Sequence, residues 1–143
     1  MWQMIKENLK TKVKHCCGTY TSLKQGLQYA PEVLDDNFDE LDVGIDEKDD
    51  LIGDFMQAGG KMAVVCKGFQ FYLTKRIKDG YGNQIAEPSG CIRIGGKAVW
   101  RRGDDIRIVE VTGIDSPQRI EVVSLDGYAV GGAVPVTELK YTA

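Results

Sequence analysis

The chain of 143 residues carries a net charge of −3, and 43% of its residues are hydrophobic. This size and composition are typical of a folded globular domain, and they exclude collagen, coiled coils, disordered chains and disulfide-rich miniproteins. The longest uncharged stretch, residues 127–137, is rich in Gly and far shorter than a membrane-spanning helix. Lysines interrupt the N-terminus where a signal peptide needs an apolar run, so we expect a cytoplasmic protein.

Charge is distributed along the chain in blocks of alternating sign. Residues 1–24 carry +4, residues 32–54 carry −10, residues 55–102 carry +7 and residues 103–143 carry −4. Blocks of opposite sign can attract one another within a fold, which predicts solvated faces that partly compensate. The alternative is that the acidic or the basic block meets a partner of opposite charge.

The first sixty residues have the pattern of helices. Apolar side chains recur at steps of three or four residues and predict an amphipathic helix over residues 2–16. They are Trp2, Ile5, Leu9, Val13 and Cys16. Ser22 and Gln25 have the spacing of a capping box, and Pro31 is expected to end the short helix that follows.

Two further helical segments are expected before residue 61. Leu34, Phe38 and Leu41 share one face of the first. The second carries acidic residues at its N-terminal end, as the helix dipole favours, and it is closed by Gly59 and Gly60.

Residues 62–77 fit both a helical stripe and an alternating strand pattern. Their β-branched and aromatic composition favours strand, and Lys67-Gly68 is a candidate two-residue turn. Residues 78–90 contain Gly, Pro, Asn and Asp and predict a loop.

From Cys91 onward the chain has the pattern of short strands joined by turns. The segment Cys91 to Ile94 is expected to be the first strand, and Gly95-Gly96 and Asp126-Gly127 are candidate hairpin turns. Ile106 and Ile108 alternate as in a half-buried strand. About five such strands are expected to curl into a small barrel that removes their edges.

In its strand lengths, its Gly turns and its V-P-V-T-E-L tail from Val134 to Leu139, this last third of the chain resembles the SH3-like small barrels of the Tudor and KOW type. The resemblance covers about 50 residues and concerns architecture. It implies binding of peptides, partner proteins or nucleic acid, but a fold alone does not fix function.

Catalytic and metal-binding patterns are weak throughout the chain. The single histidine, His15, lies beside Cys16 and Cys17, but neighbouring positions on a helix do not face each other. These residues lack zinc-ligand spacing, and the cysteines are expected to be reduced thiols. An EF-hand reading of residues 35–46 fails because Glu40 replaces the required Gly. We therefore expect no catalytic residue, no metal and no cofactor.

One constellation in the basic block has binding character. Its residues are Arg93, Lys97, Trp100, Arg101 and Arg102. Arginine pairs with phosphate or carboxylate in a two-pronged manner, and tryptophan can stack on a base or anchor a protein partner. Alternation with Ile92 and Ile94 places Arg93 on an outward face. In the alternative reading Trp100 packs in the barrel and the arginines pair with the acidic block.

The sequence therefore predicts an α+β fold with a helical segment over residues 1–60 and a β-rich segment with a small antiparallel barrel over residues 61–143. The expected function is a non-enzymatic interaction module that binds a protein partner or a second copy of itself. The alternative is nucleic-acid binding through residues 61–102, although the net negative charge disfavours it. An enzyme is a third reading, and it would need a pocket assembled from distant residues.

Overall fold

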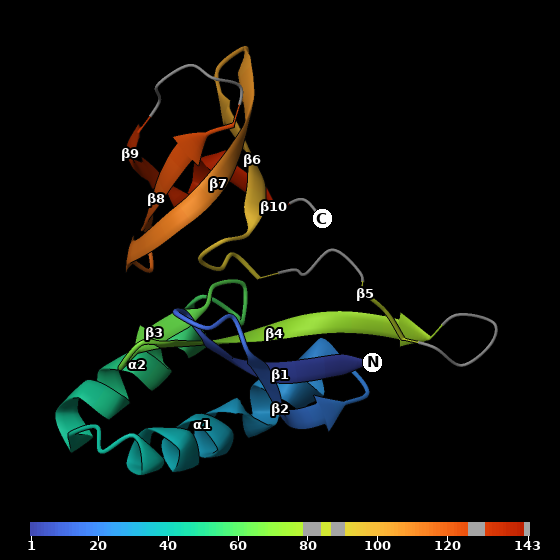
Figure 1. The fold of residues 1–143 in the computed structure, drawn as a ribbon, viewed down its shortest axis with the longest axis vertical. Helices are drawn as coiled ribbons and strands as arrows, with labels where there is room; N and C mark the ends of the chain where they lie inside the picture. The colour runs from blue at the N-terminus through green and yellow to red at the C-terminus, as the bar shows by residue number, and fades with distance from the viewer. Residues whose placement is uncertain (79–83, 87–90, 126–130, 142–143) are drawn as a thin grey trace.

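The computed structural model describes residues 1–78, 84–86, 91–125 and 131–141. Its strands form two antiparallel sheets, one above the other, and the helices lie beneath the first sheet (Figure 1). The elements in chain order are β1 Trp2–Asn8, β2 Lys14–Tyr20, α1 Leu23–Glu40, α2 Ile45–Gln57, β3 Val64–Cys66, β4 Phe69–Lys78, β5 Gln84–Ala86, β6 Lys97–Arg102, β7 Asp105–Ser116, β8 Arg119–Ser124, β9 Gly131–Pro135, the 3₁₀ helix Val136–Glu138 and β10 Leu139–Tyr141. None of the described helices is long and apolar enough to cross a bilayer.

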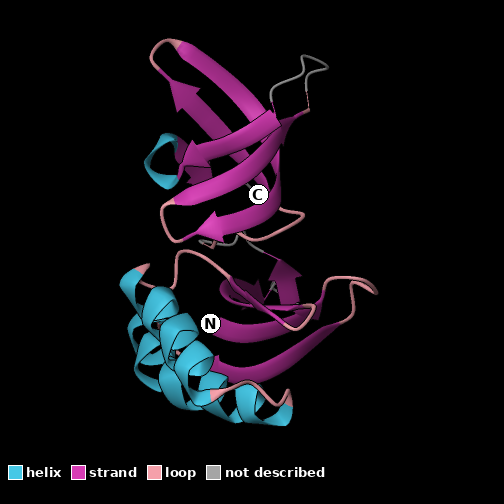
Figure 2. Cartoon of the chain, turned by 90° about the vertical axis from the view of Figure 1, so that its left-hand side faces the viewer, coloured by secondary structure: helices cyan, strands magenta, loops and turns pink. Residues whose placement is uncertain are grey.

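The first sheet has the strand order β2-β1-β4-β3, with β5 continuing beside β4. Helices α1 and α2 pack against one face of it (Figure 2). Phe38, Phe55 and Phe71 are fully buried there, and the Phe38 and Phe71 rings meet edge to face with centroids 5.2 Å apart. Burial of several aromatic side chains makes this layer the main core of the N-terminal half.

The predicted helix over residues 2–16 is wrong, because this segment forms the hairpin of β1 and β2. Both faces of β1 are covered: Met4 packs against the helices, and Ile5 faces the opposite side of the sheet. A strand that is buried on both faces carries apolar residues on each face. In this segment the spacing of these apolar residues matches the spacing expected for a helix. The Asn8 side chain accepts hydrogen bonds from the backbone of Lys10 and Thr11 and so forms the turn.

Helix α1 begins as the sequence predicts but continues further. Ser22 is its N-cap, and the Ser22 Oγ accepts a hydrogen bond from the Gln25 backbone at 3.1 Å. Pro31 does not end the helix, which runs through it to Glu40. Gly26 and Ala30 before the proline are buried, and so are Leu34 and Phe38 after it. Packing therefore holds both sides of the proline in one helix.

Several predictions for residues 45–78 are confirmed. Helix α2 ends before Gly59 and Gly60, and both glycines have positive φ. Residues 62–77 are stranded, and Lys67 and Gly68, both at positive φ, form the tight turn between β3 and β4. The predicted loop over residues 78–90 is wrong at Lys78, which is the last residue of β4, and at β5. Its other residues lie outside the described ranges.

The second sheet has the order β10-β6-β7-β8-β9. Hairpins join β6 to β7 and β7 to β8, as the turn pattern predicts, whereas the Asp126-Gly127 turn lies outside the described residues. The predicted closed barrel is wrong: over the described part of the chain, β9 and β10 form the two ends of the sheet and do not pair. The core of this sheet is formed mainly by side chains of its own strands, and Met62 and Ala58 of the first half pack against it.

The predicted α+β arrangement with a helical N-terminal half and a barrel is therefore corrected. Strands stand at both ends of the chain, the helices lie between them in sequence, and two open antiparallel sheets share a junction. The physical reason is that apolar residues of one half pack on the other half. The sequence analysis assigned these residues to a helix face in the first half and to a barrel interior in the second.

A short strap, residues 91–94, joins the two sheets. The sequence analysis predicts these residues as the first strand of the second sheet, and this prediction is wrong. They contact the first half instead, through a bridge between Ile92 and Met62. The Ile92 carbonyl accepts a hydrogen bond from Ala63 at 2.8 Å, and the Ile92 amide donates one to the Lys61 carbonyl at 2.8 Å. Cys91 and Ile92 are buried at the same place.

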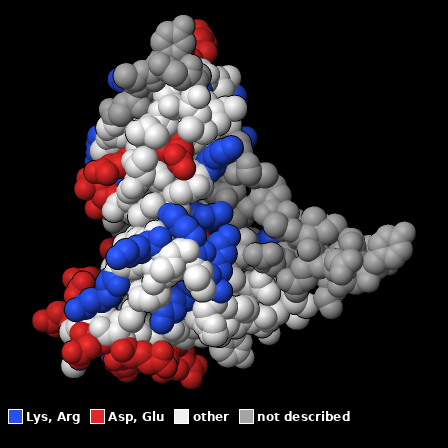
Figure 3. All heavy atoms as spheres, in the orientation of Figure 1, with Lys and Arg blue, Asp and Glu red and all other residues white. Residues whose placement is uncertain are grey.

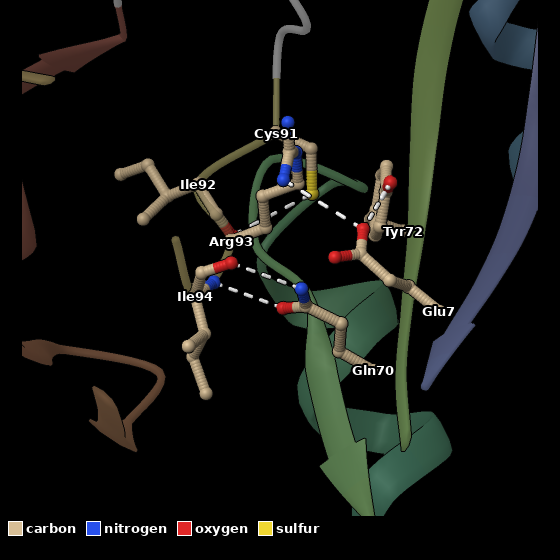
Figure 4. A network of polar contacts seen from close by, with 7 residues as sticks. All are labelled: Glu7, Gln70, Tyr72, Cys91, Ile92, Arg93 and Ile94. Atoms are coloured by element: carbon tan, nitrogen blue, oxygen red, sulfur yellow. Dashed lines mark hydrogen bonds and ion pairs between the residues drawn. The ribbon is translucent and has the colours of Figure 1, made fainter. Parts of the chain in front are cut away.

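Gln70 of β4 holds the end of the strap. Its side-chain Nε2 donates to the Ile94 carbonyl at 3.0 Å, and its Oε1 accepts from the Ile94 amide at 2.9 Å (Figure 4). Gln70 is fully buried. A glutamine that satisfies both backbone groups of one residue replaces the strand partner that residue would otherwise need.

A second polar contact lies beside it. The Tyr72 hydroxyl donates a hydrogen bond to buried Glu7 at 2.8 Å, and Arg93 Nη1 lies 3.7 Å from the same carboxylate oxygen (Figure 4). Burial and this hydrogen bond raise the pKa of Tyr72, so its hydroxyl remains a donor. Arg93 also lies over the Tyr72 ring, 5.2 Å from its centroid. The strap is thus attached by charge as well as by its backbone.

Replacing Gln70 with leucine should lower the free energy of unfolding by about 2–4 kcal/mol, because two hydrogen bonds are lost and both backbone groups of Ile94 are left without partners. Urea denaturation followed by circular dichroism measures this. The matched control is Gln28→Leu on the exposed side of α1, which should change the value by less than about 0.5 kcal/mol. Equal effects of the two substitutions would contradict the role given to Gln70.

Candidate interaction surface

The structure does not bring together the five predicted binding residues, which are Arg93, Lys97, Trp100, Arg101 and Arg102. Four lie on β6 and one in the strap. Successive side chains of a strand point to opposite faces, so Lys97 and Arg101 lie on the outer face of the second sheet. Trp100 and Arg102 share the inner face with buried Ala98. The constellation is therefore divided between two faces and the junction.

The prediction that Arg93 points outward is wrong. Its guanidinium lies against Tyr72 and pairs with Glu7 on the first sheet. Its Nε is buried and has no hydrogen-bond partner among the described residues. The alternating pattern of residues 92–94 predicts that the Arg93 side chain faces solvent. Because the strap lies on the first sheet instead of joining the second, that side of the strap is covered. Arg93 attaches the strap to the first sheet, and 22% of its side chain stays exposed there.

Trp100 is half-buried at the end of the second core. It packs against the apolar cluster of that sheet, and its Nε1 donates a hydrogen bond to the Glu138 carboxylate at 3.2 Å. A buried indole normally needs such an acceptor. This position agrees with the structural reading of Trp100 as a packed residue, and it leaves the indole less free to stack on a base.

The outer face of the second sheet carries a row of exposed apolar side chains. Ile106 is 58% exposed, Ile108 54%, Val123 38% and Leu125 46%. Val99 lies among them on β6 and is partly exposed. These five residues are called the outer patch. Single exposed apolar residues are ordinary, but several large ones on one face mark a site of contact.

The strand register makes the outer patch continuous. Val99 lies directly opposite Ile108 across β6 and β7. On the other side the Leu125 amide donates a hydrogen bond to the Ile108 carbonyl at 3.1 Å. Val123 is paired with Glu110 of β7, one step further along the same face. Side chains at such positions are neighbours across a sheet, so the outer patch spans three strands.

Charges of both signs surround the outer patch. Lys97 and Arg101 lie on β6 at one side, and Glu110 and Glu121 lie on β7 and β8. Lys97 stands directly opposite Glu110 in the register, a favourable cross-strand arrangement. The rim therefore presents no single sign of charge to an approaching molecule.

The acidic block lies on the helices, away from the second sheet. Figure 3 shows acidic side chains gathered at the helical end and basic side chains across the middle of the same face. Within the block Lys48 pairs with Asp35 at 2.9 Å and with Asp39 at 2.8 Å, and these hydrogen bonds raise the pKa of Lys48. Among the described ion pairs none joins the arginines of β6 to this block.

The sequence analysis missed the outer patch although a signal is present. Strand β7 has apolar residues on both faces, with Ile106 and Ile108 on one and Val109 and Val111 on the other. Only Val109 and Val111 are buried. A strand in an open sheet needs only one apolar face to form the core. A second apolar face is typical of a strand that another surface covers.

A second candidate lies between the β1–β2 hairpin and α1. Because β2 is a strand, His15 and Cys17 line the same depression of about 630 Å³, together with Lys6 and Glu40. The Cys17 thiol contacts the Asn37 side-chain oxygen at 3.9 Å, and burial raises the pKa of Cys17. A raised pKa leaves a thiol, which is a poor nucleophile. Over the described residues no group of three or more His, Cys, Asp or Glu side chains could hold a metal ion.

Comparison with protein-family models, with curated proteins and with solved structures finds no match to this chain. The resemblance of the last third to Tudor and KOW barrels therefore stays a prediction. Functional inference rests on the geometry of the chain itself.

Thiol reactivity should follow burial. We expect iodoacetamide to modify exposed Cys16 first and Cys17 more slowly, with the Cys17 rate rising toward alkaline pH because its raised pKa lowers the thiolate fraction at neutral pH. Buried Cys66 and Cys91 should react only after unfolding. Peptide mapping by mass spectrometry over a time course measures each rate. Fast modification of Cys91 in the native protein, or equal rates at Cys16 and Cys17, would contradict the packing described.

Proposed function

We propose that the protein is a non-enzymatic interaction module that self-associates through the outer patch. The observation that carries the proposal is the row of four large apolar side chains, which are 38% to 58% exposed, on one face of an open sheet. Water-exposed apolar surface of this kind is stabilised when a second apolar face covers it.

The size of the outer patch suits a reversible dimer. Covering the exposed half of a large aliphatic side chain contributes roughly 1 kcal/mol, and the four exposed side chains of the patch in two copies make about eight such contributions. The sum is comparable with the loss of rotational and translational freedom on association, about 4–15 kcal/mol. We therefore expect a dimer whose population depends on protein concentration.

A second copy of the chain is the occupant that the rim favours. A homodimer with twofold symmetry brings the same surface together from both copies. A rim of one sign would repel itself, but here Arg101 and Glu121 stand on different strands of the same face. Two such faces can meet with opposite charges opposed, which supports self-association.

The alternative of nucleic-acid binding through residues 61–102 has less support. Binding through this segment needs the cations of the segment itself to be gathered on one surface. Arg93 is committed to Glu7, and Arg101 and Arg102 lie on opposite faces of β6. These positions favour the interaction module.

Light scattering coupled to size exclusion should give a mass that rises toward twice the chain mass of 15.8 kDa as concentration increases. The double variant Ile106→Asp with Ile108→Asp should remain at the single-chain mass, because dimerisation would bury its carboxylates in an apolar contact.

The matched control is Val13→Asp with Ile45→Asp. These two aliphatic residues are also exposed but lie outside the outer patch, so the variant should dimerise as the parent protein does. A monomer at every concentration of the parent protein, or equal loss of dimer in both variants, would overturn the proposal. Unchanged circular dichroism establishes that each variant is folded.

A further inference from the structure

A groove of about 500 Å³ lies where the two halves of the molecule meet. Its walls come from the end of α2, the strap, the β7–β8 turn, the 3₁₀ helix and β10. Met62, Ile92, Val136 and Leu139 are the apolar part of the lining, and Lys61 and Lys140 are its cations. The groove is distinct from the outer patch, since the two share no residue.

The charge of the groove is of one sign. Among the described residues that line it there is no Asp or Glu, whereas Lys61 and Lys140 are both exposed. Within the described chain neither lysine forms an ion pair. Two uncompensated cations beside an apolar surface favour a ligand that carries both carboxylates and an apolar side chain.

One border of the groove is an edge strand. β10 pairs with β6 alone, and the described chain provides no strand on its other side. Leu139 and Lys140 of this strand line the groove. An edge strand keeps backbone donors and acceptors that an extended segment can use as a further strand. Many peptide-recognition sites combine this backbone pairing with a pocket for an apolar side chain.

We propose that the groove binds an extended acidic segment of a partner protein, with an apolar anchor in the pocket and carboxylates at Lys61 and Lys140. Each of three observations supports one part of the proposal. The apolar lining favours the anchor, the two lysines favour the carboxylates, and the β10 edge favours the extended conformation. A second copy of this chain is the competing occupant. Its outer patch carries a rim of mixed charge, so it matches the uniformly basic groove less well.

Fluorescence polarisation with two short labelled peptide pools tests the proposal. In the first pool Leu, Ile and Phe alternate with Asp and Glu, and in the second Lys and Arg replace the acids. We expect saturable binding of the acidic pool and none of the basic pool. The variant Lys61→Glu with Lys140→Glu should bind the acidic pool at least roughly tenfold more weakly, because like charges then oppose it.

The matched control is Lys10→Glu with Lys12→Glu, which makes the same charge change on the exposed β1–β2 turn and should bind as the parent protein does. Hydrogen exchange should also slow in β10 when the acidic pool is bound. Equal binding of both pools, equal loss in both lysine variants, or unchanged exchange in β10 would overturn the proposal. So would conversion of a dimer to a monomer by Lys61→Glu with Lys140→Glu, because the groove would then be filled by a second copy.

The monomeric variant Ile106→Asp with Ile108→Asp separates this inference from the proposed self-association. It should bind the acidic pool with unchanged affinity, since its substitutions lie on another surface. Loss of binding in that variant would show that the groove does not act on its own.

Discussion

The attachment of the strap to the first sheet is the constraint on which the rest of the structure depends. Residues 91–94 have no partner strand in the second sheet, so their polar groups are satisfied by Gln70 and by the backbone around Met62. The Glu7 carboxylate is nearly inaccessible, and Arg93 and Tyr72 compensate for the cost of burying it. Because these contacts come from both β1 and β4, the second sheet begins at a fixed position over the first.

This attachment explains why the second sheet need not close on itself. Met62 and Ala58 of the first half pack against its apolar core and add to its buried surface. The same placement forms the groove, since its walls come from both halves of the chain. It also leaves the outer patch on the side of the second sheet that the first half does not cover. The two proposed surfaces are thus consequences of one junction.

Local chemistry made part of this fold predictable. The Ser22 cap, the glycines after α2 and the Lys67-Gly68 turn follow from short-range rules, and the structure confirms them. The β1–β2 hairpin was not predictable from spacing, because burial on both faces mixes the strand period with that of a helix. Arg93 was misassigned for a related reason: alternation states which side chains share a face, but only the tertiary fold states which face is covered.

The binding residues show the same limit. Glu7 and Gln70 are polar residues of types that usually lie at the surface, yet both are buried and contact the strap. Ile106 and Ile108 are residues of a type that usually lies in a hydrophobic core, yet both are exposed. In both cases the sequence states which residue is present, but it does not state whether another part of the fold covers that residue.

Cooperative unfolding of the two halves tests the role of the strap most directly. Trp2 packs on the first core and Trp100 on the second, and the chain has no other tryptophan. In the variant Trp2→Phe, fluorescence therefore reports the second sheet, while circular dichroism at the helical band reports α1 and α2 of the first half. Coupling through the strap predicts that both signals change in one urea transition with the same midpoint. Two separate transitions would contradict the account, because the halves would then fold independently of their junction.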